Sequence, residues 1–248
     1  GVFGPLLVGV AVGTFFNGAM FSLDDMNRVT WATSSRGLEA VLTFHNVALG
    51  LAVFFLARVL GLLYFMNSID HEGIYQRSKK HLLYNAVPFL AFFLYFLIAL
   101  LFKDGFGYRP ETGEIYTEPY KYLNNLLAMP VNTLMLLVGV AGVLWGMAST
   151  LLKGGTKGIW FAGSGTVLTV WALFILAGFN NTSFYPSVHD LQSSLTIENA
   201  SSSRFTLIAM SYVSLIVPFV IGYIWYAWKA MNRKQISVEE LEQEHHSY

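Results

Sequence analysis

Long apolar segments alternate with short polar connections along almost the whole chain. About six of these segments are long enough to cross a bilayer, which takes roughly 20 apolar residues in a helix. The segments are residues 2–20, 39–66, 82–102, 130–152, 159–179 and 205–228. Because a backbone polar group inside a bilayer has no water to bind, each segment is predicted to be an α-helix. The pattern therefore predicts an all-α polytopic membrane protein whose transmembrane helices pack as an antiparallel bundle.

The polar connections divide the chain into five predicted parts. Residues 1–20 form a first transmembrane helix, which is expected to lack its beginning because the chain starts inside an apolar run and without a Met. Residues 39–179 hold four transmembrane helices joined by short loops. Residues 180–203 form a Ser-rich loop, residues 204–229 form the last transmembrane helix, and residues 230–248 form a polar tail.

Small residues and one proline indicate how the helices pack. Two GxxxG pairs are expected to let a neighbouring helix approach closely. They are Gly9 with Gly13, and Gly142 with Gly146. The tight turn at residues 153–157 makes the helices on either side of it antiparallel neighbours. Pro218 is predicted to bend the last helix, because proline removes one backbone hydrogen bond and crowds the preceding turn.

The distribution of Lys and Arg predicts the orientation of the chain, because cytoplasmic loops carry more of these residues. The cations on one side of the membrane stand in short, acid-poor connections: Arg77, Lys79, Lys80, Lys153, Lys157, Lys229, Arg233 and Lys234. The cations on the other side are interspersed with acids. We therefore expect the first set and the C-terminal tail to face the cytoplasm, and the Ser-rich loop to lie on the outer face.

Composition agrees with a membrane protein and excludes several other classes. Hydrophobic residues make up 54% of the chain and charged residues 12%, whereas a soluble domain has roughly 25% charged residues. The formal net charge is zero and no basic run is present, so nucleic-acid binding is not expected. The absence of cysteine excludes disulfides, a thiolate nucleophile and Cys-ligated metals or clusters.

Three polar residues in the predicted spans are candidates for binding a cofactor: Arg58, His45 and His81. Arg58 is the strongest candidate of the three, because a charge at the centre of a span costs about 3 kcal/mol. It is either a structural arginine that snorkels or pairs with a neighbouring helix, or a charge beside a proton, quinone or lipid headgroup site. No acid in the spans is an obvious partner for Arg58, so we expect its partner on another chain.

The histidines do not predict a metal site. His45 lies in the second turn of the second span and His81 opens the third. In antiparallel helices they lie toward opposite faces of the membrane, so they cannot share a metal or a haem, and interfacial or hydrogen-bonded roles are expected. The sequence also has no phosphate-binding loop and no nucleophile elbow. We therefore predict no catalytic residue and no metal ligand in this chain.

The small amount of ionisable chemistry in the spans favours a partner subunit over a stand-alone transporter or channel. A transporter usually buries acidic side chains to couple its substrate to an ion. A stand-alone transporter or channel is the alternative interpretation, and a structural subunit of some other membrane complex is the third.

The end of the chain carries residues that resemble those of a known family. They are FYP at residues 184–186, SLTIENASSS at residues 194–203, Pro218 within the last span, and YIWYAW at residues 223–228. Residues 4–13 and 17–21 look like a middle span of the same family and the loop that follows it. The chain resembles the C-terminal two-thirds of subunit II of cytochrome bd-type quinol oxidases, the cyanide-insensitive variants included.

The resemblance implies a subunit of a respiratory terminal oxidase in a bacterial inner membrane. Such an oxidase oxidises quinol, reduces dioxygen to water and adds to the proton gradient. The haems are expected in subunit I and no cofactor in this chain alone, although subunit II of some members holds a quinone and a proton path. The expected partners are the haem-bearing subunit I, the lipid bilayer and, through the complex, quinol.

Two polar motifs of the family's N-terminal half, Gly-Phe-Asp and Trp-Asp-Gly-Asn, are absent from this chain. No proton-path residue is therefore carried over from the family to a position in this sequence.

Overall fold

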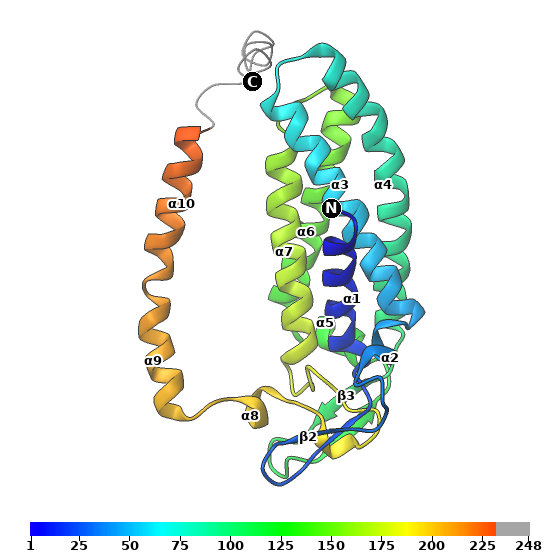
Figure 1. Cartoon of the computed structure of the whole chain (residues 1–248), viewed down its shortest axis with the longest axis vertical. Coiled ribbons are helices and arrows are strands. Elements are labelled where there is room, and N and C mark those ends of the chain that lie inside the picture. Colours follow the sequence, from blue (N-terminus) through cyan, green and yellow to red (C-terminus); the bar gives the residue numbers. More distant parts are fainter. Residues whose placement is uncertain (232–248) are drawn as a thin grey trace.

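Four long helices form the centre of the molecule in a computed structural model that describes residues 1–231 (Figure 1). They are α3 (Phe44–Ser68), α4 (Glu72–Leu101), α6 (Pro130–Lys153) and α7 (Gly158–Gly178). Successive helices run in opposite directions, and a shorter apolar helix, α1 (Phe3–Asn17), packs against α3. This antiparallel bundle confirms the predicted fold class.

Five helices in the described part of the chain are long and apolar enough to cross a membrane. Four are the helices of the bundle, and the fifth is α9 (Arg204–Ser214) taken together with α10 (Val217–Met231). At 15 residues, α1 is shorter than these five. It ends at Asn17, before the predicted boundary at residue 20, because Gly18 turns the chain with a φ of 69°.

The first GxxxG pair confirms the predicted close approach of a neighbouring helix. A Cβ added to Gly9 would lie 2.8 Å from the Cα of Gly50, and one added to Gly13 would lie 2.5 Å from the Oδ1 of Asn46. Both contacts are to α3, so the small residues of α1 allow its backbone to rest directly on that helix.

The second GxxxG pair belongs to a longer run of small residues between α6 and α7. Three positions of α6 lie against three positions of α7: Gly139 with Thr169, Gly142 with Gly165, and Gly146 with Ala162. The numbers rise along α6 as they fall along α7, so the two helices are antiparallel neighbours, as the tight turn between them predicted.

The predicted helix over residues 39–66 is wrong at its beginning. The structure divides this segment into a short helix, α2 (Leu38–Val41), and the long α3. Thr43 between them has an extended backbone and caps α3, because its side chain accepts a hydrogen bond from the backbone N–H of Asn46.

The predicted polar loop over residues 67–80 is wrong as well, since most of it is helical. Helix α3 continues to Ser68, and α4 already begins at Glu72, ten residues before the predicted span at residues 82–102. His71 caps α4, because its Nδ1 accepts a hydrogen bond from the backbone N–H of Gly73 at 3.0 Å. Hydropathy misses these first turns because they are polar and extend beyond the apolar part of the helix.

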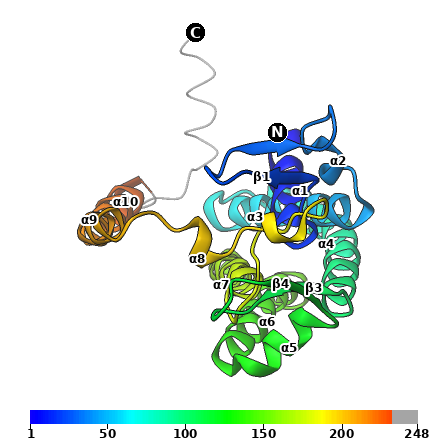
Figure 2. The same cartoon turned by 90° about the horizontal axis from the view of Figure 1, so that it is seen from below.

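The connections at one end of the bundle fold into a cap, seen from below in Figure 2. The sequence predicted only polar loops here, but the cap contains two short antiparallel hairpins. One pairs β1 (Phe21–Leu23) with β2 (Val29–Trp31), and the other pairs β3 (Gly105–Tyr108) with β4 (Ile115–Glu118). The remaining elements of the cap are α2, α5 (Lys121–Ala128), the 3-10 helix η1 (Leu191–Ser193) and α8 (Ile197–Ala200).

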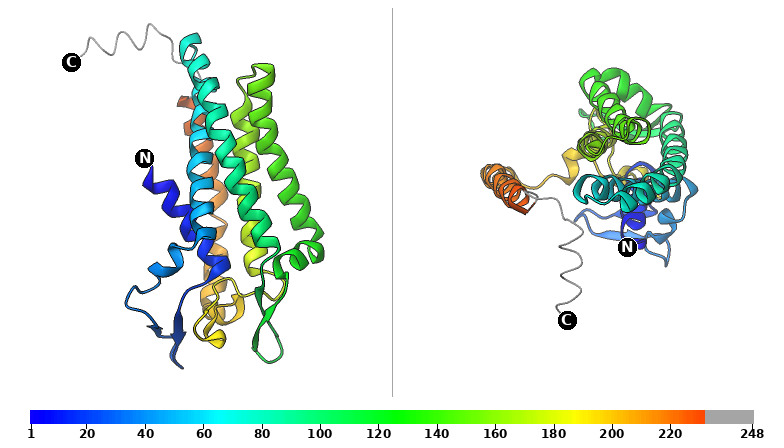
Figure 3. Two further views of the ribbon diagram at one scale, coloured as in Figure 1. Left: turned by 90° about the vertical axis from the view of Figure 1, so that its right-hand side faces the viewer. Right: turned by 90° about the horizontal axis from the view of Figure 1, so that it is seen from above.

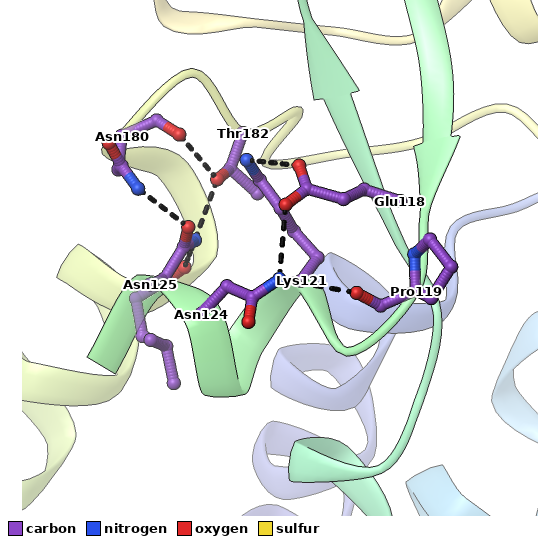
Figure 4. A network of polar contacts seen from close by, with 8 residues as sticks. Glu118, Pro119, Lys121, Asn124, Asn125, Asn180 and Thr182 are labelled. Atoms are coloured by element: carbon purple, nitrogen blue, oxygen red, sulfur yellow. Dashed lines mark hydrogen bonds and ion pairs between the residues drawn. The ribbon is translucent and has the colours of Figure 1, made fainter. Parts of the chain in front are cut away.

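A network of polar contacts holds the cap to the bundle (Figure 4). Lys121 is only 4% exposed and forms an ion pair with Glu118 at 2.8 Å. The buried Asn125 donates a hydrogen bond to the Oγ1 of Thr182 at 2.7 Å and accepts one from the Nδ2 of Asn180 at 3.0 Å. Helix α5 thereby fixes the start of the loop that follows α7.

The last span stands beside the bundle and is joined to it through α8 (Figures 1 and 3). Helix α9 ends at Ser214 and α10 begins at Val217, so the bend predicted from Pro218 takes the form of a break. None of the residues of α9 or α10 is buried within the described chain. The predicted tail at residues 230–248 lies outside the described residues from residue 232 onward.

Candidate functional site

Arg58, the charge predicted within a span, is held by the neighbouring helix. Its Nε donates a hydrogen bond to the Oδ1 of Asn85 on α4 at 2.6 Å, and its guanidinium carbon lies 5.8 Å from the centre of the Phe54 ring. Asn85 is buried, and its Nδ2 donates to the backbone carbonyl of His81 at 2.7 Å. Because His81 lies one turn earlier in α4, the helix presents a fixed amide oxygen to Arg58.

Arg58 lies deep within its helix and on the outside of the bundle. It stands ten residues before the end of α3 at Ser68, which is about 15 Å at 1.5 Å per residue. Its side chain is exposed, and none of the ion pairs among the described residues includes it. Asn85 is thus a partner within the chain, and an acidic partner on another chain stays a prediction. A guanidinium in this position can bind an anion or a carbonyl oxygen.

A second polar cluster lies where α1, α3 and α4 meet the cap. The Nζ of Lys103, two residues past the end of α4, donates to the Oδ1 of Asn17 at the end of α1. Asn17 in turn donates to the Oδ1 of Asn46 near the start of α3. Asn46 is fully buried and donates to the backbone carbonyl of Ala40 at 2.7 Å. The cluster therefore ties three helices together through side-chain amides.

His45 lies beside this cluster without a hydrogen bond from its outer ring nitrogen. The centre of its ring is 4.6 Å from the centre of the Phe96 ring on α4. Its Nε2 is buried and has no hydrogen-bond partner among the described residues. The ring therefore packs as an aromatic group against Phe96, and the expected interfacial or hydrogen-bonded role stays a prediction.

Lys103 is the member of the cluster whose protonation state can change near neutral pH. Burial lowers the pKa of Lys103 to about 8, because an ammonium loses its hydration there. Its hydrogen-bond acceptor is the neutral amide of Asn17 rather than a carboxylate. Lys103 can therefore bind or release a proton in mildly alkaline conditions, which an ordinary surface lysine does not do.

The two candidate histidines do not stand together as ligands of one haem or metal ion. His45 stands at the cap end of the bundle, whereas His81 stands in the first turns of α4 at the opposite end. His81 is exposed, and its ring contacts Tyr84 at 6.5 Å between centres. Residues 1–231 contain no group of three His, Cys, Asp or Glu side chains that could hold a metal ion. His45 and His81 therefore do not form a facing pair of axial ligands.

Arg58, His45 and His81 are recognisable in the sequence as candidates, whereas two other residues of the polar clusters are not. Asn85 accepts a hydrogen bond from Arg58, and Lys103 donates one to Asn17 in the cluster beside His45. A signal for Asn85 was present, since an amide that follows the histidine by one turn lies on the same face of a helix. No comparable signal exists for Lys103, because its partner stands 86 residues away in the chain.

A comparison with known protein families identifies the chain's relatives. The family of cytochrome bd terminal oxidase subunit II matches residues 1–231, the whole of the described chain. No curated protein matches the chain. The family match covers far more than half of the 248 residues. This chain therefore belongs to the family of cytochrome bd terminal oxidase subunit II.

Proposed function

We propose that this chain is the haem-free subunit II of a respiratory oxidase that oxidises quinol and reduces dioxygen to water. Its main role in this proposal is that of structural partner to the haem-bearing subunit I, and it carries no catalytic residue itself. The complex contributes to the proton gradient, and any bound quinone belongs to the assembled complex rather than to this chain alone.

The observation that carries the proposal is the family match over residues 1–231. The geometry of the histidines supports the haem-free part, because His45 and His81 stand at opposite ends of the bundle. The hydrogen bonds support the structural part. Both polar clusters bind one helix to the next through amide side chains, as Arg58 with Asn85 and Asn17 with Asn46 show.

We further propose that the chain lies in a bacterial inner membrane with its C-terminus in the cytoplasm. The end of the bundle opposite the cap carries the cations of the predicted cytoplasmic set within the described chain: Arg77, Lys79, Lys80, Lys153, Lys157 and Lys229. The cap carries acidic residues among its cations, as at Asp24, Asp25 and Glu118. This asymmetry supports a cytoplasmic position for the end opposite the cap.

The test is to purify the chain with and without its co-expressed partner. We expect the complex to show haem absorption bands and to consume dioxygen when quinol is supplied, and the chain expressed alone to show no haem bands. Haem bound by the chain alone would overturn the haem-free assignment. Ion or solute flux in liposomes that contain only this chain would favour the transporter interpretation instead.

A further inference from the structure

A cavity of about 60 Å³ lies at the centre of the bundle. All four long helices contribute to its wall, as Ala52 of α3, Phe93 of α4, Val143 of α6 and Thr169 of α7 show. The cavity therefore belongs to the bundle itself and depends neither on the cap nor on the last span.

The wall of the cavity offers no free polar group. Its lining is aliphatic and aromatic apart from two threonines, Thr166 and Thr169. Both hydroxyls donate to carbonyls of their own helix, to Ala162 at 2.7 Å and to Gly165 at 2.8 Å. A buried water needs two to four polar partners, so water is not stable here, and apolar cavities of this kind stay dry or take up apolar guests such as xenon.

The size of the cavity restricts the guest further. Its volume of about 60 Å³ is less than half that of the engineered apolar cavity, about 150 Å³, that binds benzene or xenon. That volume suits a small apolar molecule. Two lining residues, Leu144 and Val170, are each 42% exposed on the outside of the bundle. Only side chains therefore separate the cavity from the hydrocarbon of the membrane.

We propose that this cavity is a binding site for dioxygen, from which the oxidase draws substrate dissolved in the membrane. The proposal rests on the proposed function, because that function makes dioxygen the small apolar molecule that the complex consumes. Dioxygen is uncharged, has two heavy atoms and needs no hydrogen bond, so it matches the cavity in size and in polarity.

The experiment uses crystals of the assembled complex under xenon pressure, together with steady-state kinetics at varied dioxygen concentration. Xenon is expected to bind between Ala52 and Val143 in the wild type. Ala52→Val places two methyl groups in the cavity and is expected to abolish xenon binding. It is also expected to raise the KM for dioxygen by roughly threefold while kcat stays unchanged, as the loss of a supply site would. Ala57→Val, on the exposed side of the same helix, is the matched control and is expected to change neither quantity.

A second variant keeps the test decisive if Ala52→Val does not assemble. Val143→Ala enlarges the cavity and is expected to increase xenon occupancy. Absence of xenon from the wild type would overturn the gas site, and so would an elongated density that fills the cavity in the complex. Xenon binding with an unchanged KM for dioxygen in Ala52→Val would overturn the assignment to dioxygen. Failure of the proposed function is visible separately, as a wild-type complex that does not consume dioxygen with quinol.

Discussion

The contact between α6 and α7 at Gly165 makes a sharp prediction about the stability of the bundle. A Cβ added to Gly165 would lie 2.5 Å from the carbonyl oxygen of Gly139 and 2.7 Å from the amide nitrogen of Val143. Ordinary contacts of a Cβ begin at 3.4 Å. Because both atoms belong to the backbone, no side chain can rotate away, and Gly165→Ala must push the two helices apart by about 1 Å.

The size of the effect follows from two opposing terms. Overpacking of this kind costs about 1–3 kcal/mol, and we expect the upper end because the obstacle is backbone. Alanine gains about 1 kcal/mol over glycine in a helix, so Gly165→Ala is expected to destabilise the protein by about 2 kcal/mol. Gly163, two residues earlier in α7, has no atom within 4 Å of an added Cβ. Gly163→Ala therefore gains helix stability without a clash. The difference in stability between the two variants measures the cost of the clash alone, about 3 kcal/mol.

The assay is thermal unfolding of the purified complex, followed by tryptophan fluorescence in one detergent for all variants. For a chain of this size, 3 kcal/mol corresponds to a difference in Tm of about 6–12 °C, with Gly165→Ala below Gly163→Ala. Equal melting temperatures would refute the reasoning, because they would show that the helices can separate at Gly165 without loss of packing energy.

Three further predictions concern the polar groups. Asn85→Leu removes the acceptor of the Arg58 guanidinium and is expected to cost about 1.5–3 kcal/mol of stability, and to cost less in the Arg58→Leu background, where no charge is left unpaired. Normal turnover per assembled Arg58→Leu complex would assign Arg58 a structural role, and lowered turnover a functional one. The pKa of Lys103 is about 8 in the folded protein and about 10.4 in the unfolded chain. Between these two pH values the unfolded chain binds more protons than the folded protein, so the free energy of unfolding rises with pH. Lys103→Met is expected to remove that rise, and parallel melting profiles between pH 7 and pH 10 would contradict the prediction. Glu118→Gln leaves the buried ammonium of Lys121 without its carboxylate and is expected to lower stability by about 3 kcal/mol, which denaturation of the variant measures.

Hydropathy predicted the helix ends well where residues that start or stop a helix stand at the edges of the apolar segment. Helices α6 and α7 begin and end within one residue of the prediction, because Pro130 favours the first helical turn and Gly154 ends α6 with a φ of 68°. Hydropathy failed for the first turns of α4, where the helix leaves the apolar zone. It also failed at Thr43, which caps α3 by accepting a hydrogen bond from the backbone N–H of Asn46. In the sequence, Thr43 looks like any other polar residue in a span.

The sequence revealed the charged residue of the candidate site but not the residues that bind it. Arg58 is conspicuous because an arginine stands alone among apolar residues. Asn85 is uncharged, and its place one turn after His81 shows only that the two share a helix face, not that Asn85 accepts a hydrogen bond from Arg58. Asn17 and Lys103 meet because α1 and α4 end at the same level beneath the cap. The sequence does not show that these two helix ends are neighbours.

The two polar clusters and the cavity lie in a fixed order along the bundle. Along α3, His45 precedes the cavity-lining segment at residues 49–56, and Arg58 follows it. From His45 to Arg58 is 13 residues, or about 20 Å. The space between the two clusters is lined by residues whose polar atoms are already bonded to their own helix. Aliphatic and aromatic side chains therefore separate the two polar clusters along the axis shared by α3, α4, α6 and α7.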